Sequence, residues 1–318
     1  MPFGLLFKEI FVTMREFFNK IWSRFFQTQT PRNSLTTAGD SQLPLPDELT
    51  QSVAQETFLT YYQNGDYPGA AVIYNFQKFK CNSYRSGSEQ DVANLECIFK
   101  RMELTIFKYE NLSRKEFLTS LKTFSKYKGH KKGSMIFVAI LSHGNHNSIE
   151  TYDGKLVDLD MDVYPLFYHD ACPDLIKKPK NFIIQCCRGD QEQDLVNSSS
   201  NEVATIPNVS DISIVYSTIP LHVSYRNNSA GSWLISSYCE IIGEYGNDYD
   251  YETLTMKVSQ QVQERSNNGR RMTIERTFRG FDCYLQLKLL DPKELHEREE
   301  KRSWRRRLVL NWPTRRTA

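Results

Sequence analysis

Apolar and polar positions follow two alternating patterns along most of the chain. Short runs of branched and aromatic residues, bounded by polar or turn residues, are typical of buried strands, whereas apolar residues at three- and four-residue spacing predict amphipathic helices. The predicted strands are 70–74, 104–109, 135–141, 180–187, 212–216 and 281–289, and the predicted helices are 89–102, 113–127, 160–168, 232–243 and 252–264. Strands that alternate with helices predict an α/β fold, with a parallel sheet and helices on both of its faces.

Polar stretches divide the chain into segments. Residues 27–50 combine prolines with Ser, Thr, Gly and Gln, and residues 190–210 are rich in Ser, Asn, Gln and acids, so we predict that both are linkers. The globular part begins near Thr57. Residues 291–318 follow the last predicted strand and carry nine basic against five acidic residues, and we expect this tail to be disordered in solvent.

Residues 3–26 form an amphipathic segment of their own. Its apolar stripe recurs at helical spacing and consists of Phe3, Phe7, Ile10, Met14, Phe17, Ile21 and Phe25. Such a helix packs on its own domain, packs on a second copy of itself, or lies in a membrane interface, and its aromatic residues favour the interface. Glu9 and Glu16 argue against an organelle presequence, because such segments are poor in acids.

Composition indicates a soluble protein of a reducing compartment, and we expect the cytoplasm. Hydrophobic residues make up 40% and charged residues 25% of the 318 residues, and the net charge of +2 predicts no particular partner. The seven cysteines form no regular framework, and the adjacent Cys186 and Cys187 cannot close an ordinary disulfide. No apolar run approaches the ~18 residues needed to span a bilayer, and no secretory signal is expected.

Two predicted strands end in groups that suit a nucleophilic pair. Strand 135–141 is followed by His143, and strand 180–187 ends in Cys186 and Cys187. Because the carboxyl ends of parallel strands meet at one edge of a sheet, we expect the imidazole to lie beside a thiol, as a Cys–His pair requires. Neighbours on a strand face opposite sides, so only one cysteine faces the cleft, and we assign Cys187 to it. The alternatives are an inert buried cysteine and a zinc site, for which the ligand spacing is absent.

Four spaced motifs resemble those of the caspase family, over about residues 57–290. The segment Gln185-Cys186-Cys187-Arg188-Gly189 is similar to the pentapeptide around the caspase nucleophile, with Cys186 where alanine is usual. The other three motifs are Ser142-His143-Gly144, Arg85-Ser86-Gly87 with Asp91-Val92-Ala93-Asn94-Leu95 after it, and Ser224-Tyr225-Arg226-Asn227 with Gly231-Ser232-Trp233 after it.

The resemblance implies an architecture for the whole chain. The expected fold is a mostly parallel six-stranded sheet with helices on both faces. The implied divisions are a short prodomain at 1–56, a large-subunit region at 57–194, a linker with the small-subunit region at 195–290, and a basic C-terminal tail at 291–318. The final strand, predicted at 281–289, would pair across the interface of a homodimer of large-plus-small units.

The resemblance also implies roles for individual residues. Cys187 would attack the scissile carbonyl, His143 would handle the proton, and the N–H groups of Gly144 and Cys187 would hold the oxyanion. The implied pocket for the carboxylate of a P1 aspartate consists of Arg85, Gln185 and Arg226. A guanidinium grips a carboxylate through paired N–H bonds, so these residue types suit that ligand. The main chain of residues 224–226 would pair with extended substrate as an added strand.

Several positions depart from the family pattern or mark processing sites. Val223, where executioner caspases have an aromatic residue, predicts a roomier S2 pocket, and Tyr225 replaces the usual Trp of the S4 wall. In the linker, Asp194 is a candidate cleavage site, although Leu195 follows it where small residues are usual. Asp40 lies in a linker before a small residue, which predicts removal of the first 40 residues.

The predicted function is a cysteine endopeptidase that cleaves proteins after aspartate, in apoptosis or related signalling. It would be a zymogen activated by proteolysis, dimerisation or both, and it would need neither metal nor cofactor. The alternative is a non-catalytic homologue that regulates a related protease by heterodimerisation. Against it stands the retention of five site residues, which are Arg85, His143, Gln185, Cys187 and Arg226. Membrane contact through residues 3–26 or the basic tail remains open, and a nucleic-acid partner is not expected.

Overall fold

The computed structural model describes Tyr62 and residues 67–189, 210–227, 231–265, 271–281 and 283–310, with side chains only to residue 301 in the last range. The chain divides into two units, Met1–Glu56 and Thr57–Ala318, and all described residues belong to the second. The helix predicted over 3–26 and the predicted cleavage positions Asp40 and Asp194 lie outside the described residues. Within the described part, no helix is both long and apolar enough to cross a bilayer.

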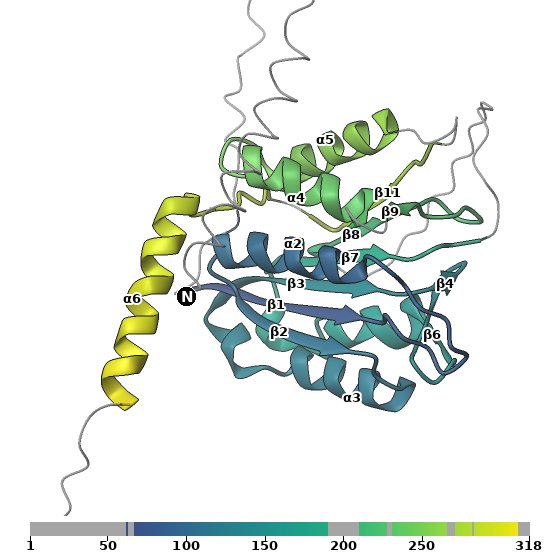
Figure 1. Cartoon of the computed structure of the whole chain (residues 1–318), viewed down its shortest axis with the longest axis horizontal. Helices are drawn as coiled ribbons and strands as arrows, with labels where there is room; N and C mark the ends of the chain where they lie inside the picture. The colour runs from purple at the N-terminus through teal and green to yellow at the C-terminus, as the bar shows by residue number, and fades with distance from the viewer. Residues whose placement is uncertain are drawn as a thin grey trace, which may run out of the picture. The chain divides into compact units, whose positions relative to one another are not determined.

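A six-stranded sheet forms the centre of the fold, in the strand order β11-β8-β7-β3-β1-β2 (Figure 1). Its strands are β1 (Tyr67–Asn75), β2 (Thr105–Glu110), β3 (Gly133–Leu141), β7 (Lys180–Gln185), β8 (Ile212–Tyr216) and β11 (Glu275–Arg279). The first five pair in parallel, and β11 pairs antiparallel with β8. The expected mostly parallel six-stranded sheet is confirmed.

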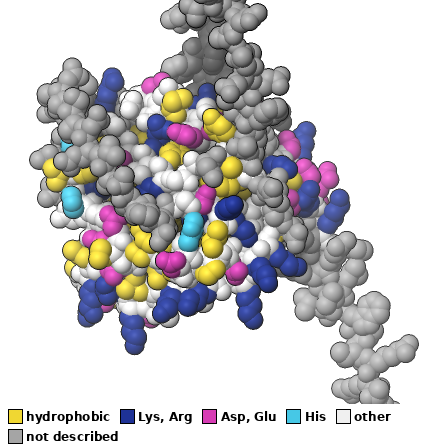
Figure 2. All heavy atoms as spheres, turned by 180° about the vertical axis from the view of Figure 1, so that it is seen from behind, with side chains coloured by type: hydrophobic (Ala, Val, Ile, Leu, Met, Phe, Trp, Pro, Cys, Tyr) yellow, Lys and Arg dark blue, Asp and Glu magenta, His cyan; other side chains and the backbone are white. Residues whose placement is uncertain are grey.

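Alternation within the central strands divides the apolar core into two. On β3, Phe137 and Ala139 belong to the core on one face of the sheet, while Ile136 and Val138 belong to the core on the other. Every residue of β3 is buried, which explains why its sequence is continuously apolar. The outer surface, in contrast, carries side chains of both charges (Figure 2).

Helices cover both faces of the sheet, as predicted. The main helices are α2 (Ser88–Arg101), α3 (Arg114–Ser125), α4 (Trp233–Tyr245) and α5 (Tyr251–Glu264). Figure 1 shows α2, α4 and α5 on one face and α3 on the other. The capping box predicted at the start of α3 is present, because the Ser113 side chain accepts from the Glu116 N–H and the Glu116 carboxylate accepts from the Ser113 N–H.

The remaining elements are short. Two small sheets accompany the main one: β4 (Gly144–Asn145), β5 (Ser148–Glu150) and β6 (Leu156–Asp158) form the first, and β9 (Arg226–Asn227) and β10 (Gly231–Ser232) form the second. The helical turns are η1 (Lys128–Lys131), η2 (Leu159–Val163), η3 (Tyr164–Phe167) and η4 (Pro173–Leu175).

The strand predicted at 281–289 is wrong, and the sixth strand is β11 instead. Leu285, Leu287 and Leu289 are buried in the core beneath the helices, so their alternation reflects extended backbone packed on helices rather than a sheet ladder. The Tyr251 N–H, for example, donates to the carbonyl of Leu285. All residues of β11 are half-buried, because it is the edge strand of the sheet. Its sequence therefore has no run of apolar residues that would predict a strand.

Two further expectations are corrected. The single helix predicted over 160–168 is a π-helical turn, η2, followed by the 3-10 turn η3, because Pro165 lacks the N–H that a continuous helix requires. The basic tail, expected to be disordered, forms the helix α6 (Pro292–Leu310) at its start. Near its first turn, Arg298 pairs with Glu294 of α6 and with Glu103 of the main body.

Asp211 anchors the chain immediately before β8. Its buried carboxylate accepts hydrogen bonds from the Tyr62 hydroxyl at 2.6 Å and from the Ser210 hydroxyl at 2.7 Å. It also lies 3.8 Å from the ammonium of Lys180, which is fully buried. Burial lowers the pKa of Lys180 to about 8, an effect that Asp211 partly offsets. One carboxylate therefore joins segments on both sides of the linker.

Replacing Asp211 tests this anchor. Asp211→Asn keeps the size of the side chain and suits its left-handed backbone (φ 60°), but it leaves the Lys180 ammonium buried without its counter-charge. We expect the free energy of unfolding to fall by about 3 kcal/mol in urea titrations, whereas the exposed Asp170→Asn changes it little. If Asp211→Asn unfolded at the same urea concentration as Asp170→Asn, the anchor would carry no stability.

Candidate active site

The site lies at one edge of the sheet, where β3 and β7 end side by side. Leu141, the last residue of β3, pairs with Gln185, the last residue of β7, so both chains leave the sheet at the same level. A cavity of about 290 Å³ opens there. Its lining residues come from both sides of the linker, and they are Arg85, Ser142, His143, Gln185, Cys186, Cys187, Ser224, Tyr225 and Arg226. Seven of the predicted site residues thus share one cavity.

The two adjacent cysteines have different surroundings. Cys186 is buried in the apolar core, and this burial raises the pKa of its thiol to about 12. Cys187 is only half-buried, and its sulfur accepts a hydrogen bond from the Ser224 N–H at 3.4 Å. The predicted alternation therefore holds, and Cys187 is the accessible thiol of the pair.

His143 sits above the cavity as a neutral imidazole. Its ring packs on Phe79 with 4.8 Å between ring centroids, and its Nε2 lies 3.1 Å from the Ser83 hydroxyl. Burial, with the nearby charges of Arg85 and Arg226, lowers the pKa of His143 to about 4. Within the described hydrogen bonds none joins His143 directly to Cys187, as is common in sites without substrate.

Two guanidinium groups face the same cavity. Arg85 is almost fully buried, and it donates from Nη1 to the carbonyl of Phe76 at 3.1 Å. Burial, and then the like charge of Arg226, lowers the pKa of Arg85 to about 9. Arg226 is half-buried, and burial also lowers its pKa. Two positive charges held this close in a poorly solvated cavity favour an anionic ligand.

Unfilled hydrogen-bonding groups mark the floor of the cavity. Gln185 donates from Nε2 to the Ser224 hydroxyl at 2.7 Å, while its Oε1 is buried. Neither that oxygen nor Nε of Arg226 has a hydrogen-bond partner within the described part of the chain. Buried polar atoms are normally paired, so these two groups are available to hydrogen-bond a polar ligand.

Asp91 is a site residue that the sequence analysis did not assign. It lies on α2, it is buried, and its Oδ1 accepts from the Ser232 N–H at 2.7 Å. Gly231 has φ +84°, and a Cβ added there would come within 2.4 Å of that oxygen, so the contact depends on glycine. Asp91 partly offsets the effect of burial on Arg85. A usable sequence signal was available, because Asp91 falls on the same helix face as Leu95.

Arg188 is a second residue that the sequence analysis left without a role. Its guanidinium bonds Glu275 of β11 at 2.6 Å and lies 4.2 Å from the centre of the Tyr216 ring. Its backbone N–H donates to the carbonyl of His222. The residue after Cys187 therefore ties the site to the edge strand and to the loop that precedes Ser224.

The other predicted site residues lie around the cavity. Gly144 packs against Cys186, and a Cβ added to it would lie 3.0 Å from both Cβ and Sγ of that residue. Tyr225 packs on Trp233, with 5.1 Å between ring centroids. Val223 is half-buried and is not part of the cavity lining. The described residues contain no group of three His, Cys, Asp or Glu side chains that could hold a metal ion.

Comparisons with known proteins agree with the sequence motifs. The family model described as "Caspase domain" matches residues 68–284. Caspase-3 of Mus musculus is 32% identical over 223 residues, which cover 67% of this chain and 79% of that protein. Caspase-2 of Gallus gallus is 30% identical over 210 residues, which cover 60% of this chain and 49% of that protein. The chain thus spans about half the length of that relative.

A solved structure shares the fold. The crystal structure of caspase-1 from Spodoptera frugiperda aligns with a TM-score of 0.66 and 25% sequence identity, covering 80% of this chain and 99% of that one. The similarity therefore extends over the whole length of that structure.

The charge on Asp91 generates a prediction about stability and pH. Burial raises the pKa of Asp91 from 3.8 to about 6, although Ser232 and the two arginines act in the opposite direction. Since the folded protein binds this proton more tightly than the unfolded chain, the carboxyl group contributes less stability as pH rises from about 4 to about 6. Relative to Asp91→Asn, the wild type should lose on the order of 2–3 kcal/mol of unfolding free energy across this window.

Urea titrations at several pH values measure that difference. Glu89→Gln is the matched control, because Glu89 is an exposed acid in the same helix, and its difference from wild type should not grow between pH 4 and 6. If the unfolding free energies of wild type and Asp91→Asn changed equally with pH, folding would not raise the pKa of Asp91.

Proposed function

We propose that this chain, which belongs to the caspase family, is a cysteine endopeptidase that cleaves proteins after aspartate. The observation that carries the proposal is the single cavity that holds a thiol, an imidazole and two guanidinium groups. A decoy homologue has no need to keep all of these groups in one place. Participation in apoptosis or related signalling is part of the proposal and rests on the family.

The proposed chemistry follows from the residues that come directly after β3 and β7. With its imidazole neutral at physiological pH, His143 is able to accept the proton of Cys187, whose sulfur then attacks the scissile carbonyl carbon. The N–H groups of Gly144 and Cys187 hold the resulting oxyanion. Return of the proton to the leaving amine gives an acyl-enzyme, which water then hydrolyses. The Ser224 N–H must release the Cys187 sulfur when substrate enters, and a bond of 3.4 Å to sulfur is weak enough to allow this.

The pocket explains the choice of aspartate. A P1 carboxylate would bond the guanidinium groups of Arg85 and Arg226 and would fill the hydrogen-bonding capacity left open beside Gln185. The S2 position, lined by Val223 rather than an aromatic residue, would accept larger side chains. The extended substrate would pair with the main chain of residues 224–226.

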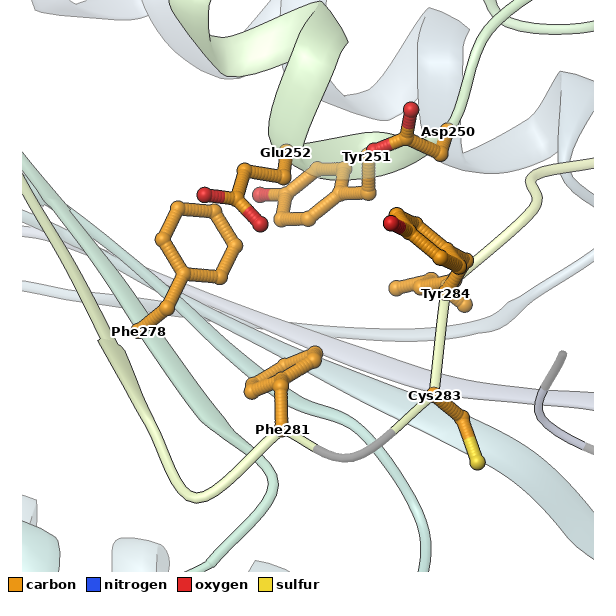
Figure 3. A pocket seen from close by; sticks show the side chains of 8 residues that line it. Asp250, Tyr251, Glu252, Phe278, Phe281, Cys283 and Tyr284 are labelled. Carbon is orange, nitrogen blue, oxygen red and sulfur yellow. The ribbon is translucent and has the colours of Figure 1, made fainter. Parts of the chain in front are cut away.

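Assembly and maturation complete the proposal. The β11 edge carries no neighbouring strand among the described residues, and it would pair with its copy in a homodimer. Beside it, Phe278 and Phe281 line a cavity of about 220 Å³ with Tyr251 and Glu252 (Figure 3). A dimer would cover this edge and the aromatic side chains of Phe278 and Phe281 beside it. Cleavage at Asp40 and Asp194 remains proposed, whereas the buried Asp211 offers a protease no access.

Peptide cleavage tests the nucleophile and the pocket together. Cys187→Ala should lower kcat/KM by at least about 10³-fold, because no other thiol in the cavity is accessible. Cys186→Ala is the matched control, and it should keep activity within a few-fold. Replacing P1 Asp by Asn should lower kcat/KM by roughly 10⁴-fold, since two buried cations lose their partner. Equal turnover of P1-Asp and P1-Asn peptides would contradict the pocket.

The imidazole gives a second, spectroscopic test. In the Cys187→Ala variant, the NMR titration of His143 should report a pKa of about 4, assigned by its absence in a variant that also carries His143→Gln. A bound product peptide that ends in aspartate should raise this pKa, because its carboxylate offsets the charges of Arg85 and Arg226. A pKa near 6.5 that the peptide does not change would show that the charges of Arg85 and Arg226 do not act on His143.

A further inference from the structure

Helices α2 and α4 run side by side in the same direction, and two hydrogen bonds fix their relative level. At one end, Asp91 accepts from the Ser232 N–H at 2.7 Å, over a sequence separation of 141 residues. At the other end, Arg101 donates from Nη1 to the carbonyl of Gly243 at 2.9 Å, over a separation of 142 residues. A residue of α2 therefore lies level with the residue about 142 positions later on α4.

Cys97 and Cys239 are related by this same separation. Each lies four residues, about one helical turn, before one partner of the Arg101–Gly243 bond, so each is on the face that its helix turns toward the other. Burial, and then the nearby charges of Asp91 and Cys97, raise the pKa of the Cys239 thiol, so Cys97 lies within electrostatic range of Cys239. Both cysteines are free thiols in the structure.

The helices approach closely at this level because one side chain is absent. A Cβ added to Gly243 would lie 3.3 Å from Cδ1 of Ile98 and 3.1 Å from Nη1 of Arg101. A disulfide needs its Cα atoms roughly 4.4–6.8 Å apart, which only closely packed helices provide. A Cβ at position 243 would require these two side-chain ends to shift by a few tenths of an ångström.

We propose that Cys97 and Cys239 form a redox-responsive pair, which peroxide converts into a disulfide that ties α2 to α4. The bond would join the large-subunit region to the small-subunit region by a link other than the linker. Disulfides in reducing compartments are usually transient and redox-sensing, which fits a bond formed only under oxidation.

The chemistry assigns different roles to the two thiols. Cys97 is exposed and therefore meets peroxide first, while Cys239 is half-buried and burial raises the pKa of its thiol well above its ordinary value. The Cys97 thiolate attacks hydrogen peroxide, breaks its O–O bond and becomes a sulfenic acid as hydroxide leaves. The Cys239 sulfur then displaces the second hydroxide, which departs with the thiol proton as water. Two thiols are oxidised, one peroxide is reduced to two waters, and a dithiol reverses the bond.

Mass mapping of the full-length Cys187→Ala chain tests the bond, since that background removes the proposed nucleophile, a half-buried competing thiol. The protein is treated with hydrogen peroxide, its remaining thiols are alkylated, and it is digested without reductant. We expect a linked peptide pair that contains positions 97 and 239, that disappears with dithiothreitol, and that is absent from Cys97→Ser and from Cys239→Ser. Cys81→Ser, which removes another exposed cysteine, should retain the pair.

A second measurement tests what the bond connects. With a site for an unrelated protease placed in the linker at 195–209, cutting should leave the oxidised large and small regions in one band on a denaturing gel without reductant. The reduced protein and the Cys239→Ser variant should give two bands. Two bands from the oxidised Cys187→Ala chain with both Cys97 and Cys239 present, or alkylation of both cysteines after peroxide treatment, would overturn the proposal.

The role of the disulfide in joining the two parts of a cleaved protease rests on the proposed function, whereas formation of the disulfide itself does not. Both measurements use a chain without the Cys187 thiol, so their outcome is independent of catalysis. Loss of peptide cleavage in wild type with the linked pair present would count against the proposed function alone. Retained peptide cleavage without the pair would count against the redox proposal alone.

Discussion

The parallel pairing of β3 with β7 is the constraint on which the site depends. Because Leu141 pairs with Gln185, the residues that follow each strand emerge at the same edge. A shift of one residue on β7 would exchange the two faces of the strand, and it would place Cys186 rather than Cys187 toward the cavity. The apolar residues that alternate between the two cores hold this register, so the packing of Ile183 and Ile184 in opposite cores also determines which thiol is accessible.

The second constraint is electrostatic. Arg85 and Arg226 are held in a cavity where burial alone disfavours their charge, and each also lies in the field of the other. Asp91 provides the opposing charge from α2, yet burial raises the pKa of Asp91 as well. Burial therefore disfavours the charged form of both the cationic and the anionic groups at this pocket. A ligand carboxylate would relieve the positive excess, and such strain at a binding site is the usual exchange of stability for function.

Sequence patterns predicted the parts of the structure in which burial and periodicity agree. β7 and β8 are buried on both faces and were visible as apolar runs, and the capping box located α3. β11 was not predicted, because an edge strand of mostly polar residues shows no apolar run. Residues 281–289 were wrongly predicted as a strand, because side chains of an extended segment packed on helices also alternate between buried and exposed. At the site, the motifs indicated the residues that face the cavity, but Asp91 and Ser83 act from behind them. Only the folded structure reveals that Ser83 reaches His143 and that the charge of Asp91 acts on Arg85.

The described residues before position 190 and those after position 209 are held together by several kinds of contact. β7 pairs with β8 along the middle of the sheet, Asp211 joins Lys180 and Tyr62 beneath it, and α2 packs on α4 above it. These contacts consist of ladder hydrogen bonds, an ion pair and buried apolar surface. Together they contribute more to the stability of the fold than the single covalent connection does. Cutting the chain between Asp190 and Pro207 would leave every one of them in place. The sheet that positions the site therefore does not depend on a covalent connection between β7 and β8.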